Sequence, residues 1–371
     1  MEERWIPAQP GRPEQVLFRR PAPEGVLRPG DVLYRLGRDA IYHGLRALAR
    51  VEPSRRTVLL PSFHCSSQIE AAEAAGLRCE FFPVRADATV DLEAIARRIH
   101  DDVLALMVIH YFGWPLDLDG LSALARERGV ALFEDCALSL FSQHRGRPVG
   151  TVGDLAIYSL RKFLPVRDGG LLRLNRSDLT ADPPTRTPSS LRPAVGAMAR
   201  AMGAGRLIRM GKRLLGRSNG EPRLPSTPDE LERPRDFEVE QADQGISSFA
   251  RYIARRIRPA EVVEQRRRAY QLLDERLREH PRYRPLFPTL PDGVCPLSLI
   301  LVHPERDAFE ARLAEQDVEA YCFGRHPHPS LDRDRFPETR VLSDQTLAIP
   351  AHQGLSERDL ARVADAVRHA L

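Results

Sequence analysis

The stretch 103-VLALMVIHYFGWPLDLDGLSALARERGVALFED-135 contains two apolar runs on either side of an amphipathic one. The apolar runs, 103–112 and 130–135, are short and rich in aliphatic residues, so each predicts a buried strand. The segment between them has apolar residues at helical spacing over 118–129 and ends at Gly129, which predicts a helix that stops there. A strand, a helix and a strand in this order indicate parallel strands connected by a helix.

The same alternation continues on both sides of this stretch. Further strands are predicted at 57–60, 79–84, 155–160 and 169–174, and helices at 67–76 and 92–99. The predicted fold class is therefore α/β, with a mostly parallel mixed sheet covered by helices on both faces. Ligands of such sheets bind beyond the carboxyl ends of the strands. Asp135, His110 and residues 61–65 directly follow predicted strands, so we expect them to converge at one edge.

The composition divides the chain into four parts. Residues 1–30 are rich in Pro and Arg and predict an irregular N-terminal arm, and 31–175 form the large α/β domain. Residues 176–240, rich in Pro, Ser, Thr and Gly, are interpreted as a partly flexible insertion. Residues 241–371 predict a linking helix at 247–280, interrupted near Pro259, and a smaller α+β domain. In that domain we expect strands at 297–302 and 346–350 and helices at 305–316 and 356–371.

Charge and cysteine usage exclude several classes of protein. The 371 residues are 42% hydrophobic and 29% charged, and a net charge of +4 does not indicate a nucleic-acid-binding protein. The five cysteines are scattered without a C-x-x-C pair, which argues against a disulfide framework and a zinc ribbon. We therefore expect a reducing, cytoplasmic location and no metal site. No apolar run approaches the ~20 residues that span a bilayer.

The insertion contains one strongly basic segment. Residues 192–217 carry seven basic and no acidic side chains. Such a run is either a solvated face or a docking site for an acidic partner or a membrane surface. The sequence leaves both interpretations open.

The second informative stretch, 158-YSLRKFLPVRDGG-170, contains one of only two lysines, Lys162 and Lys212, among 55 basic residues. Arginine can replace lysine as a charge but not as a readily deprotonated amine. A buried lysine loses its proton more easily, and the free amine can form a Schiff base with a carbonyl group. The cofactor that best matches such a lysine is pyridoxal 5′-phosphate (PLP).

PLP also needs a carboxylate facing its ring nitrogen and a cradle for its phosphate. Asp135, at the end of a predicted strand, is the candidate carboxylate. In 36-LGRDAIYHGL-45, Gly37 precedes a predicted helix whose backbone amides could bind phosphate. Arg38 could add a charged contact, and Ser159 a hydroxyl.

At this point the chain resembles the DegT/DnrJ/StrS family of sugar aminotransferases, from about residue 31 to the C-terminus apart from 176–240. The resemblance rests on seven segments in the same order as in the family: LGRDAIYHGL, LLPSFHCSSQIEAAEAAG, VIHYFGWPLDLDGL, FEDCALSL, GRPVGTVGDLAIYSL, KFLPVRDGG and LAIPAHQGLSERDL.

The resemblance implies a PLP enzyme of fold type I. Lys162 would form the Schiff base with PLP and act as general acid and base, and Asp135 would face the pyridine nitrogen. The residues implied around the phosphate are Gly37, Arg38, Ser67 and Ser159. The implied reaction is transfer of an amino group from an amino-acid donor to a keto acceptor, typically a nucleotide-linked keto-sugar. Family members are typically homodimers.

The chain differs from the family at several positions near the implied cofactor. Leu138 stands where the family has a glutamine near the cofactor's 3′ oxygen. His110 is the candidate to serve that oxygen instead; the alternatives are that His110 is a core histidine satisfied within the protein and that the oxygen has no such partner. Cys65 stands where the family often has an aromatic ring, and Asp168 replaces a glutamate. These differences keep two alternatives open. One is a PLP enzyme that catalyses elimination or decarboxylation; the other is a catalytically inactive scaffold or regulator.

Overall fold

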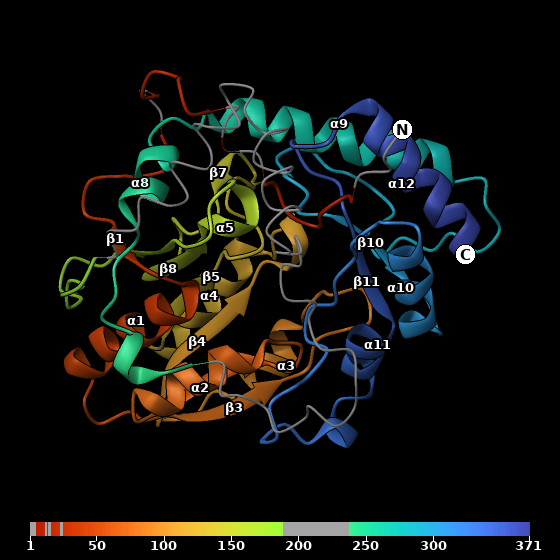
Figure 1. The fold of residues 1–371 in the computed structure, drawn as a ribbon. Helices are drawn as coiled ribbons and strands as arrows, with labels where there is room; N and C mark the ends of the chain where they lie inside the picture. Colours follow the sequence, from red (N-terminus) through yellow and green to blue (C-terminus); the bar gives the residue numbers. More distant parts are fainter. Residues whose placement is uncertain (1–4, 12, 14–15, 23–24, 188–236) are drawn as a thin grey trace.

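The computed structural model describes residues 5–11, 13, 16–22, 25–187 and 237–371. Its main feature is a seven-stranded sheet in the order β1-β9-β8-β5-β4-β2-β3 (Figure 1). The strands are β1 (Val32–Tyr34), β2 (Thr57–Pro61), β3 (Arg78–Phe82), β4 (Val103–Ile109), β5 (Ala131–Asp135), β8 (Leu155–Ser159) and β9 (Gly170–Leu174). The pairs among β3, β2, β4, β5 and β8 are parallel, whereas β9 runs antiparallel to both β8 and β1. The mixed, mostly parallel α/β sheet expected from the sequence is thereby confirmed.

Four helices connect the strands of this sheet. They are α1 (Gly37–Val51), α2 (Ser66–Ala74), α3 (Leu92–Ala96) and α4 (Leu118–Arg128). All seven residues of β4 are buried, as expected for a strand with helices on both sides of its sheet. α4 ends at Gly129, which has the left-handed conformation (φ 61°) that favours glycine. The apolar runs of the sequence therefore mark the core, and the carboxyl ends of β4, β5 and β8 lie at one edge.

The C-terminal part is built around a two-stranded antiparallel sheet of β10 (Leu299–Val302) and β11 (Thr346–Ile349). Its helices are α10 (Arg306–Glu315), α11 (Pro337–Gln345) and α12 (Glu357–Ala370). The predicted long helix is split into α8 (Ser248–Ala254) and α9 (Pro259–Leu277), because proline starts the second helix. α9 crosses from the large sheet toward the C-terminal part and packs against α12 (Figure 1).

Short elements complete the described chain: α5 (Leu160–Phe163), the hairpin β6 (Gln143–His144) and β7 (Arg147–Pro148), and the 3₁₀ turns 111–113, 239–241 and 333–335. None of these, nor β1 and α11, was predicted. The structure places the backbone of Gly245 against Tyr34 of β1, beside the large sheet. The predicted four-part division of the chain stays a prediction, and the basic segment 192–217 lies outside the described residues.

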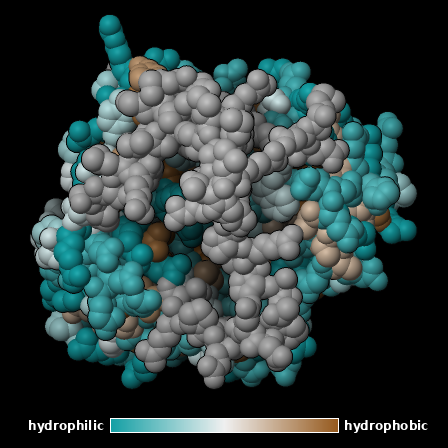
Figure 2. Space-filling model, viewed as in Figure 1, coloured by the Kyte–Doolittle hydropathy of each residue, from teal (hydrophilic) through white to brown (hydrophobic). Residues whose placement is uncertain are grey.

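The face of the molecule in Figure 2 is as hydrophilic as the charged composition of the chain leads us to expect. On the face in Figure 2, the described residues are mostly hydrophilic, with scattered hydrophobic ones. Among the described residues, no helix is both long and apolar enough to cross a bilayer.

Candidate active site

Asp135 is the last residue of β5, and it is buried at the carboxyl edge of the sheet. Its Oδ1 accepts a hydrogen bond from the backbone N–H of Ala137 at 2.8 Å, and its Oδ2 accepts one from Nε2 of Gln68. Burial raises the pKa of the Asp135 carboxyl, although the Ala137 N–H and the charge of Lys162 act in the opposite direction. The carboxylate is therefore fixed in place by two donors and depends on a nearby cation for its charge.

Lys162 lies in α5, the short turn that follows β8. Its Nζ is 5.8 Å from the centre of the Phe323 ring. Burial lowers the pKa of the amine to about 8, even though the negative charge of Asp135 raises it. A large share of Lys162 is therefore the neutral, nucleophilic amine at mildly basic pH.

The start of α1 lies beside the start of α5. A Cβ atom added to Gly37 would lie 3.8 Å from Cβ of Ser159, which precedes α5. The close approach depends on Gly170 of β9, where a Cβ would lie only 1.9 Å from the carbonyl oxygen of Leu36. α1 has 15 residues, so its N-terminal amides and dipole favour an anion at this position.

Two guanidinium groups add positive charge next to Lys162. The charges of Arg161 and Arg38 both lower the pKa of Lys162. Arg161 is half-buried and has no hydrogen bond or ion pair within the described parts of the chain. Burial and the charge of Arg38 lower the pKa of the Arg161 guanidinium. Among the described residues, Arg161 therefore carries a positive charge that an anion would balance.

Cys65 and Ser67 approach the same region from the N-terminal end of α2. The Sγ of Cys65 lies 3.2 Å from Oγ of Ser67, and the charge of a Cys65 thiolate would raise the pKa of Lys162. Asp135 and Arg38 thus both lie close enough to Lys162 for their charges to shift its pKa, and Gly37 lies next to Ser159.

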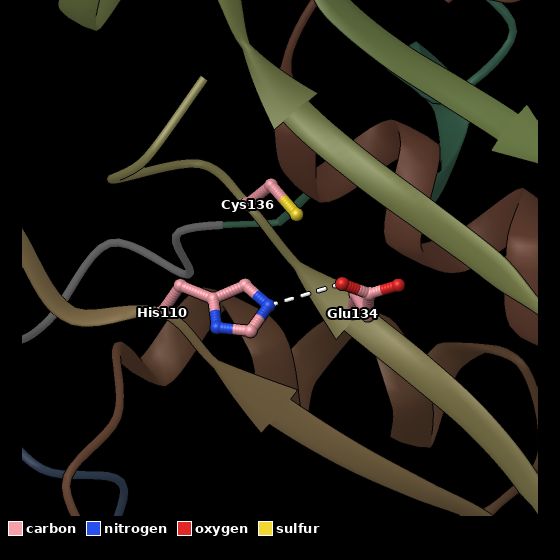
Figure 3. Close-up of side chains that lie close together, drawn as sticks. All are labelled: His110, Glu134 and Cys136. Atoms are coloured by element: carbon pink, nitrogen blue, oxygen red, sulfur yellow. Dashed lines mark hydrogen bonds and ion pairs between the residues drawn. The ribbon is translucent and has the colours of Figure 1, made fainter. Parts of the chain in front are cut away.

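His110 has an environment that favours a satisfied core histidine over a cofactor contact. Its Nδ1 accepts the backbone N–H of Leu116 at 3.1 Å, so the ring proton is on Nε2, which donates to Oε2 of Glu134 at 3.1 Å (Figure 3). Both ring nitrogens are used inside the protein, which leaves none for a cofactor oxygen. We therefore do not retain His110 as the group that serves the 3′ oxygen.

Glu134 connects three segments beneath the site. Its carboxylate accepts four hydrogen bonds: from His110, from the N–H of Gly150 at 2.7 Å, of Val152 at 2.9 Å and of Gly153 at 2.6 Å. Together with the bond from the His110 N–H to the Asp135 carbonyl at 3.1 Å, it joins the ends of β4 and β5 to the loop before β8.

The Sγ of Cys136 lies near His110 and Glu134, within ligand distance of a shared metal ion (Figure 3). The hydrogen bonds described above, however, already occupy the Glu134 oxygens and both His110 nitrogens. Burial also raises the pKa of the Cys136 thiol well above its usual value, which disfavours the thiolate that binds metals. The arrangement is that of a buried structural network.

Replacing Glu134 by Ala should destabilise the protein by about 3–5 kcal/mol, because it leaves three amides and His110 without their buried acceptor. Urea unfolding measures this loss. The matched control is Glu127→Gln, an exposed residue, which should change stability by at most about 0.5 kcal/mol. A Glu134→Ala protein as stable as the control would show that the network contributes nothing.

The pH dependence of this contribution follows from the Glu134 pKa. Burial raises the Glu134 pKa, but the hydrogen bond from His110 and those from the Gly153 and Gly150 amides outweigh it, so the pKa in the folded protein lies below 4.5. The stabilisation by Glu134 is therefore fully present at pH values above its pKa in the unfolded chain. It is lost as the pH falls through the lower pKa that Glu134 has in the folded protein.

Four features near the candidate site were missing from the sequence prediction or unexplained by it. Gln68 binds Asp135, and its orientation is set because its Oε1 accepts the Cys65 N–H at 3.0 Å. Arg161 was overlooked because a chain with so many arginines gives no signal for one of them. Asp168 holds Ser247, the N-cap residue of α8, by accepting its N–H at 2.5 Å and its hydroxyl at 2.9 Å. Leu138 is buried in the apolar core.

The comparisons with known proteins agree with this geometry. A family model described as the DegT/DnrJ/EryC1/StrS aminotransferase family matches residues 36–182 and 256–368. The chain is 26% identical over 330 residues to the dTDP-4-dehydro-2,3,6-trideoxy-D-glucose 4-aminotransferase of Saccharopolyspora spinosa, which covers 85% of this chain and 78% of that protein. It is 28% identical over 128 residues to the GDP-perosamine synthase of Vibrio cholerae, covering 34% of this chain and 35% of that protein.

Solved structures share the fold. The crystal structure of the aminotransferase TlmJ from Streptoalloteichus hindustanus matches with a TM-score of 0.64 and 25% identity, over 92% of this chain and 85% of that one.

Proposed function

Because the chain belongs to the DegT/DnrJ/EryC1/StrS aminotransferase family, we propose that it moves an amino group from an amino-acid donor to a nucleotide-linked keto-sugar. The observation that carries the proposal is Lys162: a lysine with a lowered pKa beside the buried carboxylate of Asp135. Relatives are named for amino transfer to a dTDP-linked sugar and for synthesis of GDP-perosamine. These names support a nucleotide-sugar acceptor.

We propose PLP as the cofactor, and the described residues fit it. Arg161 has no ionic partner within the described ranges, and its pKa is lowered by burial; a phosphate would supply a negative charge for it. The residues that would hold the phosphate are Arg161, Arg38, Ser67, Ser159 and the amides at the start of α1 from Gly37 onward. When bound, PLP supplies a carbonyl group for an amine and a ring that accepts electrons.

The protein's own groups have separate tasks in this proposal. Lys162 acts as the nucleophilic amine and then as the base that moves a proton at the carbon atom bearing the donor's amino group. Asp135, held by Gln68 and Ala137, places a negative charge opposite the cofactor's ring nitrogen. The two tasks need opposite charge preferences. Burial favours the neutral amine of Lys162, and the Ala137 N–H and the charge of Lys162 act against the effect of burial on the Asp135 carboxylate.

We further propose a homodimer, which the family resemblance implies, and a cytoplasmic location. The latter is supported by the five cysteines, which are all free thiols.

The function is tested by following the amino group itself. The purified full chain would be incubated with PLP, ¹⁵N-labelled glutamate or glutamine, and dTDP-, UDP- or GDP-linked 4-keto-sugars, and mass spectrometry would detect ¹⁵N in the sugar. We expect transfer to at least one nucleotide-sugar. Release of CO₂ or loss of a substituent from the donor without transfer would favour the decarboxylation or elimination alternative. A protein that neither binds PLP nor alters any donor would favour a scaffold.

A further inference from the structure

The turn that carries Lys162 is unusual in how its C-terminal carbonyl groups are satisfied. α5 has only four residues, so most of its carbonyl groups have no partner inside the helix. The Lys162 carbonyl accepts a hydrogen bond from Nη2 of Arg266 at 3.2 Å. The neighbouring Phe163 carbonyl accepts one from Nε2 of Gln353. Both donors come from the part of the chain beyond residue 258.

Arg266 is completely buried on α9, and the partners of its guanidinium among the described residues are all neutral. Besides Lys162, its Nη1 donates to the carbonyl groups of Pro296 at 3.2 Å and Leu297 at 2.8 Å. Its guanidinium carbon lies 4.6 Å from the centre of the Phe163 ring. No carboxylate pairs with it among the described residues, and burial lowers its pKa to about 10.

A buried guanidinium without a counter-ion is costly. Within the described parts of the chain Arg266 forms no ion pair, so its contribution to the fold comes through the carbonyl groups and the Phe163 ring that it connects. Arg266 thus connects the carbonyl group of Lys162 to that of Leu297. Leu297 lies two residues before β10, so the Lys162 turn is linked to the segment directly before that strand.

Gln353 makes the corresponding connection on the other strand of the small sheet. It follows β11 in the loop before α12. β10 and β11 pair with each other, with Leu299 opposite Ile349. The backbone of the Lys162 turn is therefore attached to the flanking segments of both strands, and Phe323 of the same part of the chain packs near Nζ.

We propose that Arg266 and Gln353 are positioning residues that fix the Lys162 turn to the two-stranded sheet, and thereby fix where the amine lies. This inference rests on the proposed role of Lys162. It predicts that loosening either link lets the amine reach solvent. Of the charged groups that face Lys162, Asp135 of β5, Arg38 of α1 and Cys65 before α2 stay in place, whereas Arg161 belongs to α5 and moves with the turn.

The near absence of lysine permits a direct test. In a Lys212→Arg background Lys162 is the only lysine, so ¹³C-labelled lysine should give a single Cε resonance, whose shift with pH reports the ionisation of this amine without any cofactor or turnover. In the otherwise wild-type protein we expect a midpoint near pH 8. Arg266→Met should raise it by about one unit toward the ordinary value near 10.5, because the amine regains water. Gln353→Ala should raise it by a smaller amount.

The matched control is Arg306→Met, which removes another buried arginine, of α10, that does not contact α5. It should lower the melting temperature and leave the Lys162 midpoint unchanged. Raised midpoints in both test variants, but not in the control, support the positioning role. Lower melting temperatures with unchanged midpoints would overturn it, since they would show a purely structural role. If Arg266→Met does not fold, the Gln353→Ala midpoint decides the question.

The readout also separates this inference from the proposed function. A chain that transfers no amino group can still show the raised midpoints, and an active enzyme can still show none.

Discussion

Replacing Lys162 by Arg should abolish covalent attachment of PLP and lower amino transfer by at least about 10²–10⁴-fold, the contribution expected of a general acid–base group. Arginine keeps the positive charge but offers no primary amine at accessible pH. The attachment is measured by trapping with borohydride and locating the adduct by mass spectrometry. The transfer is measured with the ¹⁵N assay.

The chain provides its own control for this experiment, because it has only one other lysine. Lys212→Arg makes the same chemical change and should retain both the adduct and the activity. If the adduct persists in the Lys162→Arg protein, the amine that binds PLP is another group, and the assignment of the site is wrong.

The large sheet could be predicted because its central strands have a recognisable sequence pattern. β4 and β5 are buried along their whole length, so their sequences are continuous apolar runs. The split between α8 and α9 was visible in Pro259, which fits the first turn of a helix but not its interior. In these segments local pattern and tertiary burial point to the same structure.

Two of the missed elements, β1 and α5, are ones in which tertiary contacts, and not local pattern, decide the conformation. β1 has three residues and exists because it pairs with β9. α5 has four residues, too few for any helical periodicity, and its free carbonyl groups are bound by distant side chains. A strand ending at residue 160 was therefore the natural expectation, and the structure turns into a helix one residue earlier.

The same distinction holds for the candidate site. Lys162 and Asp135 could be proposed from the sequence, because a rare lysine and a carboxylate at the end of an apolar strand are each unusual. Gln68, Arg266 and Gln353 have no such signal: each acts on a residue at least 67 positions away. For His110 the sequence left two interpretations open, a cofactor contact and a satisfied core histidine, and the hydrogen bonds of its ring to Glu134 and Leu116 favour the second.

Asp135→Asn should lower amino transfer by about 10²–10³-fold, the loss typical when one preorganised electrostatic group is removed from an active site. The amide has almost the same shape but no charge. Because the charge of Asp135 raises the Lys162 pKa, its loss should also move the Lys162 midpoint below 8. The two effects are measured independently, by ¹⁵N transfer and by the lysine resonance of the cofactor-free protein.

Asp135→Asn could also lose activity because it loses its hydrogen bond with Gln68 and not because it loses the charge. A second substitution at Gln68 distinguishes the two explanations. Its Oε1 is occupied by the Cys65 N–H, so its Nε2 would face the new amide donor, and the lost hydrogen bond should cost about 1–3 kcal/mol. Adding Gln68→Glu reverses the polarity of the pair, restores the hydrogen bond and moves the negative charge from position 135 to position 68. We expect the double variant to regain stability in urea unfolding but not activity. Recovery of both would mean that hydrogen bonding, and not the position of the charge, is what the site requires of Asp135.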